Sequence, residues 1–284
     1  MLTANREQPL TQKLKIPFWN DEERRVRSFW RLLAQLTLTI LMLLSISLLS
    51  LPQAVSGNIL FAVTVSGLAI VLSIFIVGKW LDQRDWRTFG LSFSKSWWRQ
   101  LGYGLLIGTV SMSLIFLVLW QIGWATITGS FVVADGSQPF YIAILTPLWL
   151  FLLVGIYEEL LTTGFWMKNM AEGLNYPRIS KKTAVVIAFV ISAVLFGLLH
   201  AGNPNTTVIS TINLMLAGLM LGLGYLLTNE IALPIGMHIT WNFVQGNVFG
   251  FAVSGSEFVG ASFFTVSQGG PEWFTGGAFG PEAG

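Results

Sequence analysis

Five polar side chains interrupt apolar segments in the second half of this 284-residue chain. They are Glu158, Glu159, His200, His238 and Asn242, spread over three apolar segments. His200 and His238 are the only histidines in the sequence. A charged carboxylate within a lipid-embedded helix costs several kcal/mol, about 2.5–3.5 on insertion scales. We therefore expect these side chains to face a shared polar cavity and not lipid.

These residue types suit hydrolysis. A buried glutamate can activate water as a general base, because burial raises a carboxyl pKa towards the working pH. Histidines and an asparagine can stabilise the oxyanion of a tetrahedral intermediate. Each residue alone also has a structural explanation, such as packing, snorkelling to the interface or hydrogen bonding between helices. Their joint occurrence on hydrophobic segments favours the shared site.

The same set contains a possible metal centre. Glu158, His200 and His238 form a His–His–Glu combination, which is a known zinc ligand set. No HExxH motif occurs, so the spacing carries no specific metal signal. The expectation is a site without a cofactor, with zinc as the alternative.

Helical spacing places pairs of these residues together. His238 and Asn242 are four residues apart and share one helical face. Phe196 stands in the same relation to His200. Phe196 is therefore expected to support the site.

The adjacent carboxylates point about 100° apart on a helix, so at most one of them can point straight into the site while the other flanks it. Glu158 lies ten residues before Lys168, or about 15 Å along a helix at the standard rise. His238 lies eight residues after Glu230, or about 12 Å by the same rise. The clusters are thus predicted to meet at one depth, nearer the cytoplasmic face.

Composition defines the elements that must position these residues. The chain is 53% hydrophobic and 11% charged, far below the roughly 25% charge of globular proteins. An all-α, polytopic transmembrane helical bundle of about seven helices is predicted. The segments are 29–51, 58–79, 101–123, 141–166, 184–200, 208–228 and 231–250.

Charge and cysteine usage narrow the function. The net charge of +2, with dispersed basic residues, excludes nucleic acid as an expected partner. The absence of cysteine excludes disulfides, zinc–thiolate sites and thiol nucleophiles. The expected partners are the lipid bilayer and a membrane-associated substrate.

The distribution of Lys and Arg predicts orientation. The basic residues lie in the N-terminal region, the 79–99 loop and 168–182, and none follows Lys182. These regions fall on one side of an alternating path, so the N-terminus is predicted to be cytoplasmic. The expected division is a solvated tail (1–28), a bundle (29–250, with the catalytic-type core from about 141) and a Gly-rich C-terminal tail (251–284). That last tail is expected to be loop, and the Trp-rich segment 82–104 an interfacial anchor.

Three motifs resemble a known family. "EELLTTGF" (158–165), "FGLLH" (196–200) and "HITWN" (238–242) are similar to the EExxxR, FxxxH and HxxxN motifs of the CPBP family. This family, also called Abi, joins CAAX proteases and bacteriocin-processing enzymes. The resemblance covers roughly 80–250 in order and spacing, and "GGAFGPEAG" (276–284) is also similar to family members. Those members often continue into a further hydrophobic helix, so a truncated or a seven-helix version of the family is expected here.

The resemblance implies a glutamate-type intramembrane endopeptidase acting on a membrane-associated or lipidated peptide or protein in the bacterial plasma membrane. By motif position, Glu158 would activate water, with Glu159 beside it and His200 supporting the water. His238 and Asn242 would form the oxyanion hole.

One position departs from the family pattern. Thr163 stands where the motif has arginine, five residues after Glu158. An arginine there would balance a buried negative charge, whereas threonine offers only a hydroxyl. A non-catalytic relative that acts as an immunity or scaffold membrane protein is therefore the alternative. A proton-coupled transporter is a third hypothesis, which the absence of an internal repeat disfavours.

Overall fold

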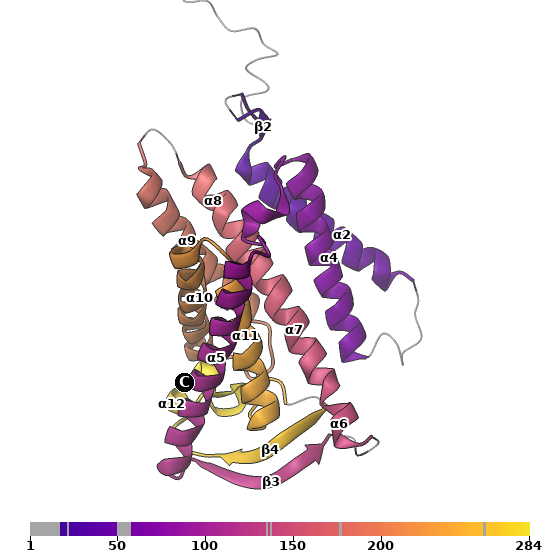
Figure 1. Cartoon of the computed structure of the whole chain (residues 1–284), viewed down its shortest axis with the longest axis vertical. Coiled ribbons are helices and arrows are strands. Elements are labelled where there is room, and N and C mark those ends of the chain that lie inside the picture. The colour runs from indigo at the N-terminus through magenta and orange to yellow at the C-terminus, as the bar shows by residue number, and fades with distance from the viewer. Residues whose placement is uncertain are drawn as a thin grey trace, which may run out of the picture.

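The computed structural model describes residues 18–21, 23–49, 58–134, 136, 138–175, 178–257 and 260–284. The chain forms a helical bundle with a small sheet across one end (Figure 1). The long helices are α2 (Ser28–Ser47), α4 (Ile59–Trp80), α5 (Lys95–Gln121), α7 (Leu145–Glu159), α9 (Lys181–Leu199), α10 (Val208–Thr228) and α11 (Ala232–Phe243). Shorter helical elements are η1 (Trp86–Phe89), α6 (Phe140–Ala143), η2 (Leu160–Trp166), α8 (Met167–Gly173), η3 (Val244–Val248), α12 (Glu272–Thr275), η4 (Gly277–Phe279) and η5 (Pro281–Ala283).

The helical membrane fold predicted from composition is confirmed. Within the described residues, six helical stretches are long and apolar enough to span a bilayer: 28–47, 59–80, 95–121, 140–173, 181–199 and 208–228. The fourth of these is a composite of α6, α7, η2 and α8. The seventh predicted segment, 231–250, forms the 12-residue α11 followed by η3 and is shorter than the other six. It lies inside the bundle, where most of α11 is buried.

Close backbone approach fixes α11 against α5. A Cβ added to Gly104 would overlap the carbonyl oxygen of Leu233 and lie 2.9 Å from the backbone nitrogen of Met237. Gly236 of α11 is as tightly placed against the backbone of α5 at Leu101. Small residues at such crossings allow membrane helices to approach closely. The α5–α11 pair is therefore the packed centre that carries His238 and Asn242.

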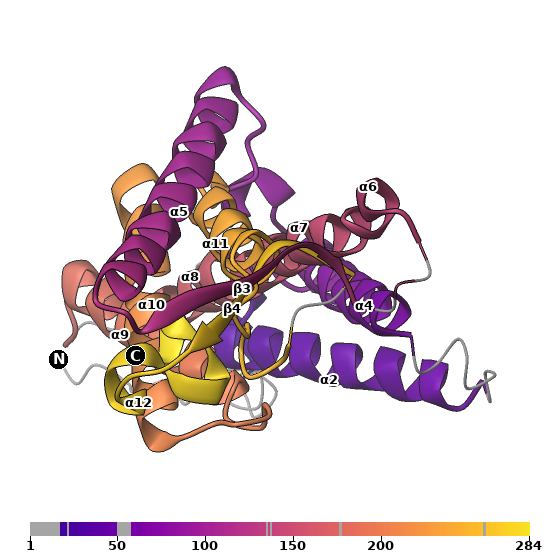
Figure 2. The ribbon, with the colours of Figure 1, turned by 90° about the horizontal axis from the view of Figure 1, so that it is seen from below.

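The described part of the C-terminal tail contains a strand and three short helices, so the prediction of a loop for 251–284 is wrong there. Strand β4 (Ala261–Gln268) pairs antiparallel with β3 (Ala125–Val133), a segment expected to be loop as well. Figure 2 shows the two strands crossing one end of the bundle. The sequence pattern missed this sheet because its two strands lie more than 100 residues apart and only pairing with each other satisfies their backbones.

The N-terminal region and the Trp-rich segment also differ from expectation. Residues 1–17 lie outside the described residues, but β1 (Trp19–Asn20) pairs with β2 (Arg25–Val26) and Arg25 is buried. Within the Trp-rich segment 82–104, Trp97 is a core residue whose indole N–H donates to the Gly90 carbonyl at 2.9 Å. Trp98 remains exposed.

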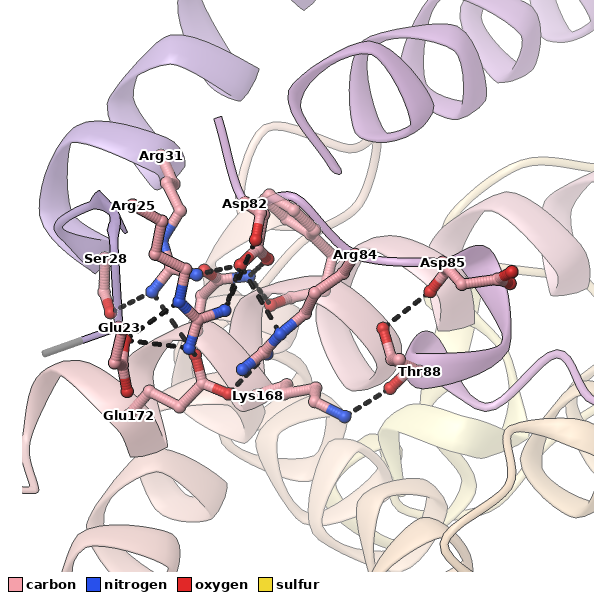
Figure 3. Close-up of polar contacts among 12 residues, drawn as sticks. Glu23, Arg25, Ser28, Arg31, Asp82, Arg84, Asp85, Thr88, Lys168 and Glu172 are labelled. Carbon is pink, nitrogen blue, oxygen red and sulfur yellow. Dashed lines mark hydrogen bonds and ion pairs between the residues drawn. The ribbon is translucent and has the colours of Figure 1, made fainter. Parts of the chain in front are cut away.

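A buried ion cluster explains the order of the N-terminal region. Asp82, fully buried after α4, accepts hydrogen bonds from Arg25 at 2.6 Å and from Arg31. Glu172 of α8 pairs with both arginines and with Arg84 (Figure 3). Arg25, Arg31 and Asp82 are buried. Their pairing offsets much of the free-energy cost of removing these charges from water.

Candidate active site

The two glutamates lie where helix geometry changes. Glu158 and Glu159 end α7, and the chain continues as the π-helical segment η2, in which the Met167 N–H reaches the Thr162 carbonyl. A second π-helical segment, η3, begins two residues after Asn242. Such π-bulges occur often at functional sites because the extra residue per turn redirects side chains.

Glu159 is the flanking carboxylate, and it is completely buried. Its Oε1 lies 3.0 Å from His238 Nδ1, and its Oε2 accepts a hydrogen bond from the Thr163 hydroxyl at 2.8 Å. Thr163 therefore contacts the carboxylate that the motif arginine would have faced. The Thr163 hydroxyl satisfies one oxygen of Glu159, and the imidazole of His238 is the hydrogen-bond partner of the other.

Glu158 is the carboxylate that faces the cavity. Its Oε2 lies 3.9 Å from Nε2 of His200 and 3.9 Å from Nε2 of His238. Within the described part of the chain, this buried oxygen has no hydrogen-bond partner. The prediction that one glutamate enters the site while the other flanks it matches this geometry.

The histidine rings are held by their other nitrogens. His200 Nδ1 lies 2.8 Å from the Phe196 carbonyl, and because a carbonyl only accepts, Nδ1 donates this hydrogen bond. The Phe196 ring contacts both imidazoles, with centroids 4.9 Å from His200 and 5.9 Å from His238. Phe196 thus supports both rings, and each Nε2 is left to face Glu158.

A cavity of about 490 Å³ opens onto these groups. Glu158, both histidines and Asn242 form its polar wall, and residues of α4 and α7 form its apolar wall. The apolar lining includes Ile59, Val63, Ile70, Leu150, Phe151 and Val154. A larger cavity of about 940 Å³, beside the N-terminal hairpin and α8, shares no residue with it.

The structure thus brings together all five predicted polar residues and both supporting ones. Among the described residues, no three His, Cys, Asp or Glu side chains are grouped so as to hold a metal ion. The sequence reading missed Ser254 and Glu282, which lie with His200, His238 and Asn242 around a second, smaller chamber. Nothing in the Gly-rich tail signals this contact, which arises only from folding of the tail onto the bundle.

Comparison with known families gives one match, which covers the segment that carries these residues. Residues 140–244 match the model of the family described as type II CAAX prenyl endopeptidase Rce1-like. No curated protein and no solved structure matches the chain. The matched region includes all seven residues of the site and its support, from Glu158 to Asn242. This segment of the chain is therefore similar to the Rce1-like family.

Proposed function

We propose that the protein is an intramembrane endopeptidase that hydrolyses a peptide bond with water activated by Glu158. The observation that carries this proposal is the position of Glu158 Oε2, 3.9 Å from both Nε2 atoms. This separation exceeds a direct hydrogen bond, and one water about 2.8 Å from each atom fits between them. The family match over 140–244 supports a peptidase of the CAAX-protease type.

The two histidines suit different tasks. Because His200 Nδ1 donates to Phe196, the neutral ring has its Nε2 lone pair on the side of Glu158, where it accepts a hydrogen bond from the water. His238 pairs through Nδ1 with the buried Glu159, which favours the doubly protonated ring. Its Nε2–H, with the Asn242 amide, then stabilises the oxyanion.

The reaction follows from these roles. Glu158 takes a proton from water as the oxygen attacks the peptide carbonyl carbon, and the carbonyl electron pair moves to oxygen as the oxyanion. Glu158 returns the proton to the amide nitrogen as the oxyanion collapses and the C–N bond breaks. Water supplies one proton and one hydroxyl to the two products, so the step is balanced without a metal or redox cofactor.

The apolar wall supports a membrane-associated or lipidated peptide or protein as the substrate. Residues of α4 and α7, which belong to two of the apolar stretches, line the same cavity as Glu158. An extended peptide joined to an apolar anchor fits such a surface, because the anchor stays in a lipid-like environment while the peptide reaches the polar wall.

The test is a peptidase assay on detergent-purified protein with prenylated and unprenylated peptides. Glu158→Gln is expected to lose at least about 100-fold of the cleavage rate, the scale of a lost general base. Glu272→Gln, a change of an exposed residue in α12, is the matched control. Cleavage is expected to persist with chelator, and a loss that added zinc restores would contradict the metal-free mechanism. A wild-type rate in Glu158→Gln would contradict the whole proposal.

Thr163 favours a second candidate, a non-catalytic immunity or scaffold relative. Glu159 is buried with a hydroxyl and an imidazole as partners, where the motif has arginine. In this case, Glu158→Gln and His238→Ala would keep the cellular phenotype of the wild type. Proteolysis that appears only in Thr163→Arg would identify an enzyme that has lost activity through this substitution.

A further inference from the structure

The cavity of about 940 Å³ lies apart from the candidate active site, between the N-terminal hairpin, α2, α8 and α9. Ser28, where one apolar stretch begins, and Gly173, where another ends, both line it. Ile191 also lines it and lies ten residues after Lys181, the start of a third stretch, or about 15 Å along a helix at the standard rise. The cavity therefore begins where the apolar stretches meet the membrane surface and continues along their apolar part.

The polar part of the cavity wall carries charges of both signs. Arg27 and Arg31 supply two guanidinium groups, and Asp21, Glu23 and Glu172 supply three carboxylates. Arg31 and Glu172 belong to the ion cluster of Figure 3 and pair with each other there. A ligand with both a phosphate and an ammonium group matches this wall, because each group finds the opposite charge. A ligand with negative charge alone faces an excess of carboxylates.

Two buried side chains of the wall have polar atoms without partners. Arg31 donates to Asp82 Oδ1, and the Asn169 amide donates to Asp82 Oδ2 at 3.4 Å, so one carboxylate holds both side chains. Within the described residues, Arg31 Nε and Asn169 Oδ1 have no hydrogen-bond partner, although both side chains are at least 99% buried and line the cavity. One is a donor and the other an acceptor. An occupant that offers both an acceptor and a donor, directly or through one water, removes the cost of leaving them unpaired.

The remaining wall of the cavity is apolar. Its side chains come from α2, the end of α8 and α9, and they are Phe29, Trp30, Leu32, Met170, Leu174 and Ile191. Aromatic side chains are typical of the level at which lipid headgroups lie. One cavity thus joins a polar wall of mixed charge to an apolar wall, which is the combination that a phospholipid requires.

We propose that this cavity binds one membrane phospholipid with a phosphoethanolamine headgroup. The phosphate lies toward Arg27 and Arg31, and the ammonium lies toward Asp21 and Glu23. A primary ammonium donates hydrogen bonds, which the Asn169 amide oxygen requires, whereas the quaternary ammonium of a choline headgroup has no N–H. Because lipid tails are as apolar as the wall beside them, the headgroup contacts supply the preference. The site does not depend on the proposed function.

Native mass spectrometry of the full chain in detergent tests this site. The protein is titrated with dioleoyl phosphatidylethanolamine, phosphatidylcholine and phosphatidylglycerol. One phosphatidylethanolamine per chain is expected, bound at least about threefold more tightly than the other two, the scale of an exposed ion pair. Glycerophosphoethanolamine carries the same headgroup without chains. It is expected not to bind at concentrations at which the lipid saturates, because the chains concentrate the headgroup at this depth.

Two pairs of variants locate the lipid. Asp21→Lys is expected to weaken phosphatidylethanolamine binding roughly 3–10-fold and to strengthen phosphatidylglycerol binding, since it reverses one wall charge. Glu272→Lys makes the same charge change at an exposed residue outside this cavity and is expected to change neither. Ile191→Trp fills the space beside the chain and is expected to weaken binding at least about tenfold. Val190→Trp, at an exposed neighbour outside the cavity, is its matched control.

Several outcomes would overturn the inference. Equal affinity for the three lipids would remove the headgroup preference, and equal effects within each pair of variants would place the lipid elsewhere. Binding of glycerophosphoethanolamine as tight as that of the lipid would assign the cavity to a soluble phosphate ester. Thermal denaturation checks that each variant is folded, and Asp21→Lys, at an exposed residue, decides alone where Ile191→Trp is not. Because the readout is lipid binding, loss of peptidase activity in any assay leaves this result unchanged.

Discussion

Glu158 and Glu159 are adjacent in sequence but have different surroundings. Glu158 faces a cavity and two imidazole Nε2 atoms, whereas Glu159 is completely buried against His238 and Thr163. The difference follows from the 100° step between neighbouring helical positions. In the proposed mechanism, Glu158 takes a proton from water, and Glu159 orients the imidazole of His238.

The contact between Thr163 and Glu159 predicts a measurable effect on stability. Thr163→Val keeps the side-chain shape but removes the hydroxyl that donates to Glu159 Oε2. A buried carboxylate oxygen left without this donor is expected to lower the free energy of unfolding by about 1–3 kcal/mol. Denaturation in detergent measures the change. Thr109→Val is the control, since that hydroxyl only donates to the Leu105 carbonyl of its own helix. Equal stability of the two variants would refute the proposed importance of the contact.

Glu282 predicts how stability depends on pH. Burial raises its pKa in the folded protein, so the native state holds this proton over a range where the unfolded chain has lost it. The stabilising contribution is complete below the unfolded pKa and is lost as pH rises through the folded pKa. The melting temperature of the wild type, relative to Glu282→Gln, is therefore expected to fall as pH rises from about 4.5. A difference that is constant from pH 4 to 8 would contradict the raised pKa.

At the scale of elements, the α5–α11 crossing determines where His238 and Asn242 lie. The two helices approach at Gly104 and Gly236, where a Cβ would meet the backbone of the other helix. Because protein interiors are close-packed, a side chain added at this crossing would displace one helix relative to the other. The position of the proposed oxyanion groups thus depends on two glycines, Gly236 two residues before His238 and Gly104 on the facing helix.

A pair of glycines on α5 tests this dependence. Gly104→Ala is expected to push α11 away and to lower stability by about 1–3 kcal/mol, as overpacking does. Gly102→Ala is the matched control, since nothing lies within 4 Å of its added Cβ. That change is expected to be neutral or to stabilise by up to about 1 kcal/mol, because alanine favours a helix over glycine. Thermal denaturation distinguishes the two, and a harmless Gly104→Ala would contradict the tight crossing.

At the scale of the whole molecule, two long-range contacts close the ends of the bundle. The ion cluster joins the N-terminal hairpin, the segment after α4 and α8 (Figure 3). The β3–β4 sheet crosses the other end (Figure 2) and leads into the segment that carries Glu282. The site lies among helices that these two closures hold in place.

The ion cluster predicts a large effect from one carboxylate. Asp82→Asn removes the buried negative charge shared by Arg25 and Arg31. Breaking a buried ion pair on one side costs about 3–5 kcal/mol, because the remaining charges stay desolvated. Asp85→Asn, an exposed change nearby that affects only the cap of η1, is expected to cost at most about 1 kcal/mol. Denaturation midpoints measure both, and similar midpoints would contradict the importance of the buried cluster.

The sequence by itself determined the membrane fold and most of the helical segments, and it predicted the polar residues that the structure brings together around the cavity. Apolar runs of spanning length set the helices, and the spacing of four between His238 and Asn242 placed both on one face. These inferences succeed because they depend on local periodicity. The expected cytoplasmic N-terminus also comes from local charge patterns, and it remains a prediction.

Only the tertiary structure decided which glutamate faces the cavity, what Thr163 contacts, how the tail folds and where Glu282 lies. Each of these features depends on a contact with a side chain or strand that is distant in the sequence. A local sequence pattern does not identify such a partner. Trp97 and Arg25 show the same limit. Both lie in segments that were predicted to be exposed, and both are buried because the fold supplies a hydrogen-bond partner for Trp97 and an ion-pair partner for Arg25. Burial of a polar group is favourable only with its partner in place, and the partner is a property of the fold.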